Sequence, residues 1–170
     1  MADAAQIAID ALYATLELNL PSTLASLDAE RDPELLRLSD PPARFVKRRP
    51  FPSDADLLVP LVMLDNKRVE PGGDWKNGER LVTVRLDVWF PGRISDPDVV
   101  LEAVSAMCGA IYGVVETGDG RGPYMVGGVD AVTVCRPRTL NLPQMVRQTE
   151  RQVPVQIARA NPEFEIQVWI

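Results

Sequence analysis

A glycine-rich stretch, ETGDGRGPYMVGG over residues 116–128, is the segment whose composition best suits a site of chemistry. Phosphate-binding loops follow a strand, precede a helix and end in a lysine with a serine or threonine. Here the predicted helix precedes the loop, a predicted strand follows it, and that lysine is absent. The reversed order also excludes a dinucleotide-binding loop, and the ligands of a calcium-binding loop are missing. We interpret the stretch as a connection between the helix and the strand. The alternative is a loop that becomes ordered when it binds a partner, with Arg121 and Tyr124 as the contact residues.

Two groups of charged side chains have spacings that could suit acid–base or metal chemistry. Asp96 and Asp98 lie where a helix is predicted to begin, and negative charge there favours the helix dipole. Arg85 and Asp87 are two residues apart, on one side of a predicted strand. They are expected to pair with each other or across a subunit boundary. Neither group is expected to meet a third charged partner, so no acid–base or metal centre is predicted.

The chain contains no histidine and only two cysteines. Histidine is the commonest general base, and it usually activates a serine or cysteine nucleophile. Cys108 and Cys135 lack the paired spacing of a zinc site and are interpreted as buried small apolar residues. We therefore predict that the protein is not an enzyme and has no metal or cofactor.

Composition and charge favour a folded protein that does not bind duplex DNA. The chain has 170 residues, of which 46% are apolar and 25% charged, with a net charge of −6. These fractions suit one globular domain, residues 1–170, and the negative charge disfavours contact with phosphates. Neither a signal peptide nor a run of about 18 apolar residues is recognised, so synthesis in a reducing cytoplasm is expected.

The first third of the chain changes character at residue 32. Residues 1–31 are predicted to be helical, with a first helix that Pro21 ends and a short second helix after it. Residues 32–56 hold five prolines and are interpreted as an extended surface linker. Its basic cluster includes Arg48 and Arg49. They could contact an acidic partner, but we favour a solvated loop.

Residues 57–170 are predicted to form a core of sheet and helix. The helix spans residues 95–118, with Ser95 or Asp96 as the N-cap and Pro97 in the first turn. Its predicted apolar stripe consists of Val100, Ala103, Val104, Met107, Ile111 and Val114. The first two strands form a hairpin around a turn-rich loop at residues 66–79. The predicted strands span residues 56–65, 80–92, 129–137, 147–160 and 163–170.

Alternation along the second strand separates a core face from a mixed face. Because the strands alternate and are joined mainly by turns, we predict an α+β fold. It has a mostly antiparallel sheet, helices packed on one face and a long hairpin loop. The core-facing side chains are predicted to be Val82, Val84, Leu86, Val88 and Phe90.

The tryptophans are the best indicators of a contact surface. Trp75 lies in the predicted hairpin loop, Trp89 on the mixed strand face and Trp169 near residue 170. Exposed aromatic side chains often mark interfaces, although a covering helix would also explain them. The candidate interface residues are Trp75, Arg85, Asp87, Trp89, Arg121, Tyr124, Trp169, Arg48 and Arg49.

The order of elements resembles that of tail terminator and tail-completion proteins of long-tailed bacteriophages. The similarity covers most of the chain but rests on pattern and has no diagnostic motif. The matching segments are ALYATLELNLPSTLASL, RLVTVRLDVWFPG, DPDVVLEAVSAMCGAIYGVV and FEIQVWI.

The resemblance implies a structural virion protein in the tail or neck region. Members of this family form homo-oligomeric rings, usually hexamers, that join the tail tube protein to the head–tail connector proteins. DNA would then pass through the ring without specific binding. The alternatives are another virion part, such as a connector, tube or baseplate subunit, or a small ligand-binding domain or enzyme. The last class would need a deep pocket with converging polar groups.

Overall fold

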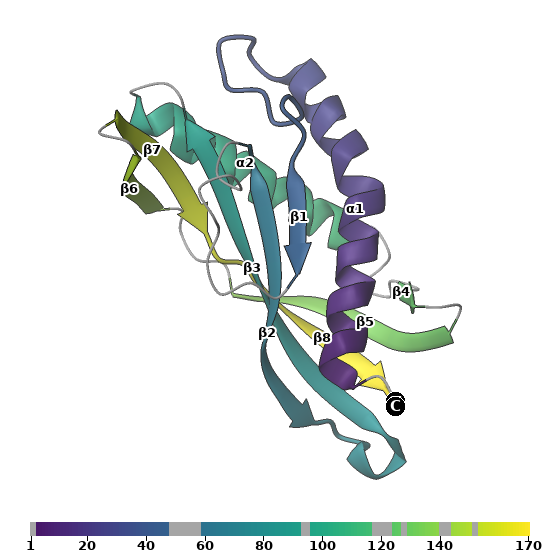
Figure 1. Cartoon of the computed structure of the whole chain (residues 1–170). Coiled ribbons are helices and arrows are strands. Elements are labelled where there is room, and N and C mark those ends of the chain that lie inside the picture. The colour runs from purple at the N-terminus through teal and green to yellow at the C-terminus, as the bar shows by residue number, and fades with distance from the viewer. Residues whose placement is uncertain are drawn as a thin grey trace.

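The computed structural model describes residues 3–47, 59–92, 96–116, 124–126, 129–139, 144–150 and 153–170 (Figure 1). The long helices are α1, Ala4–Glu30, and α2, Pro97–Glu116, and a short 3-10 turn, η2, spans Trp75–Asn77. The strands are β1 Arg44–Lys47, β2 Leu61–Pro71, β3 Glu79–Gly92, β4 Tyr124–Val126, β5 Val129–Thr139, β6 Gln144–Glu150, β7 Val153–Ala160 and β8 Glu163–Trp169.

The strands form one sheet in which β3 is the central element. The main order is β1-β2-β3-β8-β5-β4, and β6 and β7 extend it beside the second half of β3. β3 pairs with β2 on one side. On its other side it pairs first with β8 and then with β7. Every pairing is antiparallel except that of β1 with β2. The predicted α+β class with a mostly antiparallel sheet is confirmed.

The N-terminal segment forms one helix, so the prediction that Pro21 ends a first helix was wrong. Asp3 caps α1 by accepting a 2.7 Å hydrogen bond from the N–H of Gln6. Pro21 lies on the exposed side, where water can solvate the carbonyl that a proline cannot reach. Leu20 and Leu24 are buried on either side of the proline. Tertiary packing of this leucine stripe therefore holds the helix together through Pro21.

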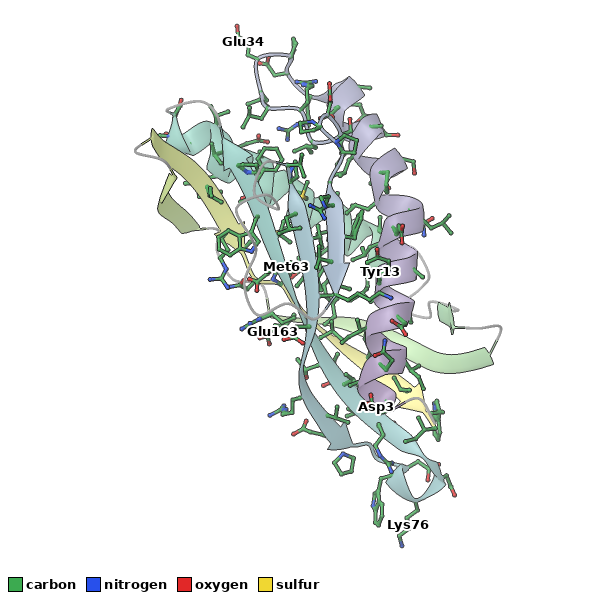
Figure 2. All side chains as sticks on the ribbon, in the orientation of Figure 1. Asp3, Tyr13, Glu34, Met63, Lys76 and Glu163 are labelled. Atoms are coloured by element: carbon green, nitrogen blue, oxygen red, sulfur yellow. The ribbon has the colours of Figure 1, made fainter. Side chains whose placement is uncertain are left out.

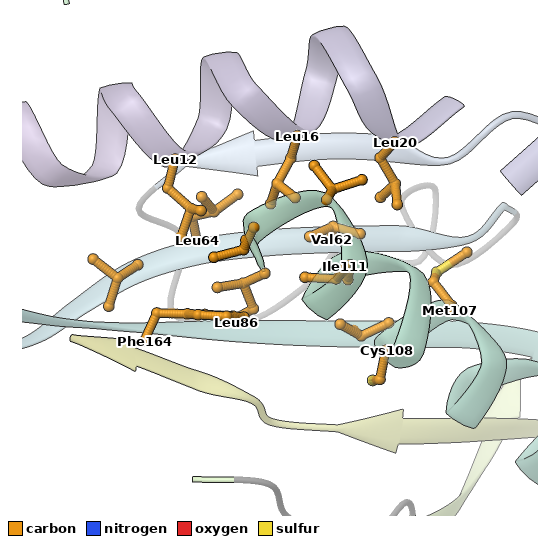
Figure 3. Packing of buried hydrophobic residues seen from close by; sticks show 14 of the residues in the cluster. Leu12, Leu16, Leu20, Val62, Leu64, Leu86, Met107, Cys108, Ile111 and Phe164 are labelled. Carbon is orange, nitrogen blue, oxygen red and sulfur yellow. The ribbon is translucent and has the colours of Figure 1, made fainter. Parts of the chain in front are cut away.

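The core joins both helices to one set of alternating strand residues. In Figure 3, Leu12, Leu16 and Leu20 of α1 point towards side chains of β2 and α2. The predicted core face of β3 and the predicted apolar stripe of α2 are both buried, as expected. Asp96 caps α2, since its Oδ1 accepts a 3.0 Å hydrogen bond from the N–H of Asp98. The buried residues of the α2 stripe are Val100, Ala103, Val104, Met107, Ile111 and Val114.

Helix α2 also buries a cysteine and is unusually apolar. Cys108 is 4% exposed, and burial raises the pKa of its thiol to about 12, so the thiol stays protonated. This confirms the interpretation for Cys108, whereas the side chain of Cys135 lies outside the described part.

By length and composition, Pro97–Val115 could cross a bilayer. Because its apolar stripe packs in the core, α2 is a core helix of this fold.

The segment interpreted as a surface linker contributes more to the fold than expected. Leu38 is fully buried, and Arg44–Lys47 form β1, a parallel edge strand on β2. Asp28 of α1 anchors this segment, because it accepts hydrogen bonds from the N–H groups of Leu38 and Ser39 and from the Ser39 hydroxyl. Arg31 binds Glu102 of α2 at 2.5 Å. The polar contacts that fix the segment come from distant residues, which local pattern does not reveal.

Asp28 is expected to make folding stability depend on pH in the acid range. Burial alone would raise its pKa, but the hydrogen bonds from Ser39 and Leu38, with the charge of Arg37, outweigh burial and lower it below 3.8. The stabilisation is therefore complete above that value and is lost as the pH falls through the folded-state pKa. Asp28→Asn should cost about 1–3 kcal/mol of unfolding free energy near neutral pH.

Urea titrations of the Asp28→Asn variant and the unsubstituted protein, from about pH 6 to about pH 2, would measure this difference. The gap in unfolding free energy should narrow as the pH falls below 3.8, the ordinary carboxyl value. A gap that stays constant over this range would show that Asp28 acts through shape and not through its charge.

Two other strand predictions need correction. β2 continues to Pro71, with a bulge between Asn66 and Arg68, and β3 begins at Glu79, so half of the loop expected at residues 66–79 is strand. The stretch predicted as one strand over residues 147–160 instead forms two strands, β6 and β7, which pair with each other. A single alternating pattern cannot show where a chain reverses unless the turn has its own sequence signal.

Candidate interface at the hairpin end

The hairpin of β2 and β3 extends beyond the start of α1 and ends in a short connection, residues 72–78 (Figure 1). We call residues 68–82, together with the adjoining Ile170, the hairpin end. Ile170 joins it because its N–H donates a 3.0 Å hydrogen bond to the carbonyl of Gly78. Lys76 marks the far tip in Figure 2.

A buried carboxylate organises the connection from beneath. Glu79 is 7% exposed, and its side chain accepts hydrogen bonds from the N–H of Asp74 and from the side-chain amide of Gln167. Gly72 packs directly on this side chain, so that a β-carbon there would overlap it. These contacts fix the position of the connection relative to β8.

Further hydrogen bonds close the turn around Trp75. The N–H of Gly78 donates to the Trp75 carbonyl at 3.2 Å, and Arg80 donates to the same oxygen at 3.1 Å. The side-chain amide of Asn77 donates to Asp74 at 2.8 Å. Because backbone and side chains are held in this way, Trp75 is presented from a pre-ordered turn. A pre-ordered contact residue loses less conformational entropy on binding than one in a flexible loop.

The hairpin end carries most of the exposed large apolar side chains in the described part of the chain. Trp75 is 54% exposed, Ile170 is 53% and Val69 is 44%, and the remaining one is Leu18 of α1. The ammonium group of Lys76 lies 5.9 Å from the centre of the Trp75 ring. A rigid turn with an exposed tryptophan and a neighbouring cation matches the composition of interface anchors.

The expected pair of Arg85 and Asp87 has a third member. Their closest charged atoms are 3.9 Å apart, whereas Arg159 of β7 binds Asp87 Oδ1 through Nε at 2.9 Å and a terminal nitrogen at 2.8 Å. The prediction that no third charged group converges here was therefore wrong. Asp87 is 7% exposed and its charge is compensated, so the group reads as a structural ion pair.

Trp89 is buried, in contrast to the exposed position that alternation suggested. It is 8% exposed and belongs to a second apolar cluster with Leu61, Met63 and Ile157, on the strand face opposite the main core. The guanidinium of Arg159 lies 4.8 Å from the centre of its ring. Figure 2 places Met63 and Glu163 on the middle of the sheet, well away from the hairpin tip. Trp89 therefore belongs to the scaffold rather than to the hairpin end.

The other candidate residues divide into described and undescribed ones. Trp169 lies in β8, opposite Glu79, and is partly exposed. Tyr124 belongs to β4 by its backbone, but its side chain is not described. Arg48, Arg49 and Arg121 lie outside the described residues, as does most of the glycine-rich stretch. Their predicted contacts stay predictions.

Within the described ranges, no group of three or more aspartate, glutamate, cysteine or histidine side chains could hold a metal ion. Comparison with known proteins does not assign the chain to a family, since neither a family model nor a curated protein matches it. The hairpin end is the described feature best suited to a function.

Gly78 is expected to be the most sensitive backbone position of the hairpin end. Its φ is +99°, and a β-carbon would overlap the carbonyl oxygen of Ile170. Gly78→Ala should therefore cost about 1–3 kcal/mol, because the substitution adds strain and the carbonyl must move. The unfolding free energy in urea would measure this cost.

Gly73→Ala is the matched control for the glycine substitution. A β-carbon at Gly73 would meet only a Glu79 oxygen at 3.8 Å, which is an ordinary contact. It should change stability by less than about 0.5 kcal/mol. Equal losses at the two glycines would show that the turn tolerates rearrangement and is not rigid.

Proposed function

We propose that this protein is a structural part of a phage virion, a tail terminator that self-assembles into a ring. The ring, which the family resemblance implies is a hexamer, would join the tail tube to the head-side connector. The observation that carries the proposal is the pre-ordered hairpin end with Trp75 at 54% exposure. A side chain of this size on a fixed turn suits contact with another protein surface.

Two properties of the whole chain support this assignment. The net charge of −6 would let DNA pass through a ring lumen without specific binding. The ion cluster of Arg85, Asp87 and Arg159 is already internally paired. An assembly role explains the hairpin end without requiring a reaction. The protein would act in the tail or neck of the virion after synthesis in the host cytoplasm.

Another virion part is the second candidate, because the hairpin end would serve a connector, tube or baseplate subunit equally well. These roles differ in how the subunits assemble. A terminator should stop at closed rings, whereas a tube subunit should continue into filaments. A ligand-binding domain or enzyme would not require self-assembly at all.

The deciding experiment is the mass of the purified protein by light scattering, with negative-stain images of the same fractions. Closed rings of uniform size support a terminator or connector, and addition of tail tube protein separates them, since a terminator should cap the tubes. Long tubes formed by this chain alone would replace the proposal with a tube subunit. A monomer that also fails to cap tail tubes would contradict it.

A further inference from the structure

Leu18 is the most exposed large apolar side chain in the described residues, at 79% exposure, and it lies on the outer side of α1. Pro21 and Ala25 are exposed on the same side, roughly one and two turns further along. No charged side chain occurs between residues 18 and 27. We call Glu17, Leu18, Pro21 and Ala25 the α1 outer patch.

The polar groups near this patch are partly occupied within the helix. The hydroxyls of Ser22 and Thr23 both donate to the carbonyl of Asn19, at 3.1 and 2.9 Å. They therefore leave the apolar surface of Leu18 and Pro21 available for contact. An exposed apolar strip of this kind is favoured when another protein surface covers it.

Pro21 gives the patch a hydrogen-bonding preference as well as a shape. An N–H at residue 21 would donate to the carbonyl of Glu17 in a regular helix, but proline has none. The Glu17 carbonyl therefore lacks its usual helical donor on the exposed side. The patch combines an apolar side chain, a backbone acceptor and the Glu17 carboxylate.

The hairpin end has the complementary chemistry. The Trp75 indole offers a large apolar ring and a single N–H donor with no acceptor. Lys76, beside the ring, supplies a positive charge. The Trp75 ring is therefore complementary to the apolar side chain of Leu18, and its N–H is complementary to the Glu17 carbonyl. The ammonium group of Lys76 is complementary to the Glu17 carboxylate.

We propose that the hairpin end of one subunit docks on the α1 outer patch of a second copy of this chain. The Trp75 ring covers Leu18 and Pro21, its N–H donates to the Glu17 carbonyl, and Lys76 approaches the Glu17 carboxylate. This inference rests on the proposed self-assembly into rings. Because the two surfaces differ, the contact is head-to-tail, which is the kind that closes a ring when repeated by rotation.

Complementation between two damaged subunits tests the contact. Leu18→Asp removes the patch, and Trp75→Ala removes the anchor. Each variant alone should lose rings, with self-association weakened at least about tenfold by Leu18→Asp and at least about 30-fold by Trp75→Ala. An equimolar mixture retains one intact contact per pair, so it should form dimers and no rings. Light scattering across a concentration series separates monomers, dimers and rings.

Ala29→Asp is the matched control, since it adds the same charge to the same side of α1, about 16 Å from Leu18. This variant should still form rings. Rings formed by Leu18→Asp as readily as by the unsubstituted protein would overturn this contact while leaving the ring proposal intact. Mixtures that remain monomeric would also overturn it. Failure of the unsubstituted protein to form rings, even with tail tubes, would instead contradict the proposed function.

Discussion

Replacement of Trp75 by alanine is expected to weaken self-association at least about 30-fold, which corresponds to about 2 kcal/mol per contact. The side chain is 54% exposed in the single chain, so little of its surface helps to fold the subunit. Burial against a neighbouring subunit would remove the remaining surface from water and use the indole N–H. The loss recurs at every contact of a closed ring, so rings should disappear. Sedimentation velocity at increasing protein concentration would measure the effect.

The folded subunit provides the control for this prediction. Trp75→Ala should change the unfolding free energy by less than about 0.5 kcal/mol, as for other exposed sites. Trp75→Phe keeps an aromatic ring but lacks the N–H donor, so its self-association should fall between those of the other two forms. If rings persist in Trp75→Ala at the same concentrations, the hairpin end is not the contact that holds them.

Replacement of Phe164 by alanine is expected to be the most destabilising single change in the core. Phe164 of β8 is fully buried, and its ring lies 5.3 Å from that of Tyr112 in α2. Truncation of a buried phenylalanine costs about 3–5 kcal/mol, through lost burial and the remaining cavity. This is a large part of the roughly 5–15 kcal/mol that holds a typical domain folded.

Thermal unfolding of the Phe164→Ala variant should show a melting temperature lower by roughly 6–20 °C, at about 2–4 °C for each kcal/mol. Leu18→Ala is the comparison, since Leu18 is 79% exposed and should shift the melting temperature little. Both variants should be studied at concentrations where the protein is monomeric. A small shift for Phe164→Ala would mean that α2 and β8 can close the cavity.

Elements with uninterrupted local patterns were predictable from the sequence. The second hairpin strand shows strict alternation, and its predicted inward residues are all buried in β3. Helix α2 combines an acidic cap, a proline in the first turn and a regular apolar stripe, so its start at Pro97 was predicted correctly. In both elements local preference and tertiary packing favour the same structure.

Features that depend on distant residues were not predictable in this way. Pro21 looks like a helix end until Leu20 and Leu24 are seen to pack against the core. Arg159 is not visible as a partner of Asp87 until β7 pairs with β3 and brings Arg159 opposite Trp89. Glu79 reads as a turn residue, although its carboxylate reaches Gln167 of β8. The exposed turn position of Trp75 was predictable because its turn-rich neighbours carry a local signal.

The double pairing of β3 has a mechanical consequence. A pull on the hairpin tip would run along β3, which is bonded to β8 over its first half and to β7 over its second half. β2 flanks its other side along most of this length. Because the force would act parallel to the strands, many hydrogen bonds must shear together before any strand can slide. A subunit held at its hairpin end would therefore transmit a pulling force through β3 into β2, β7 and β8 together, and the sheet would resist extension as a unit.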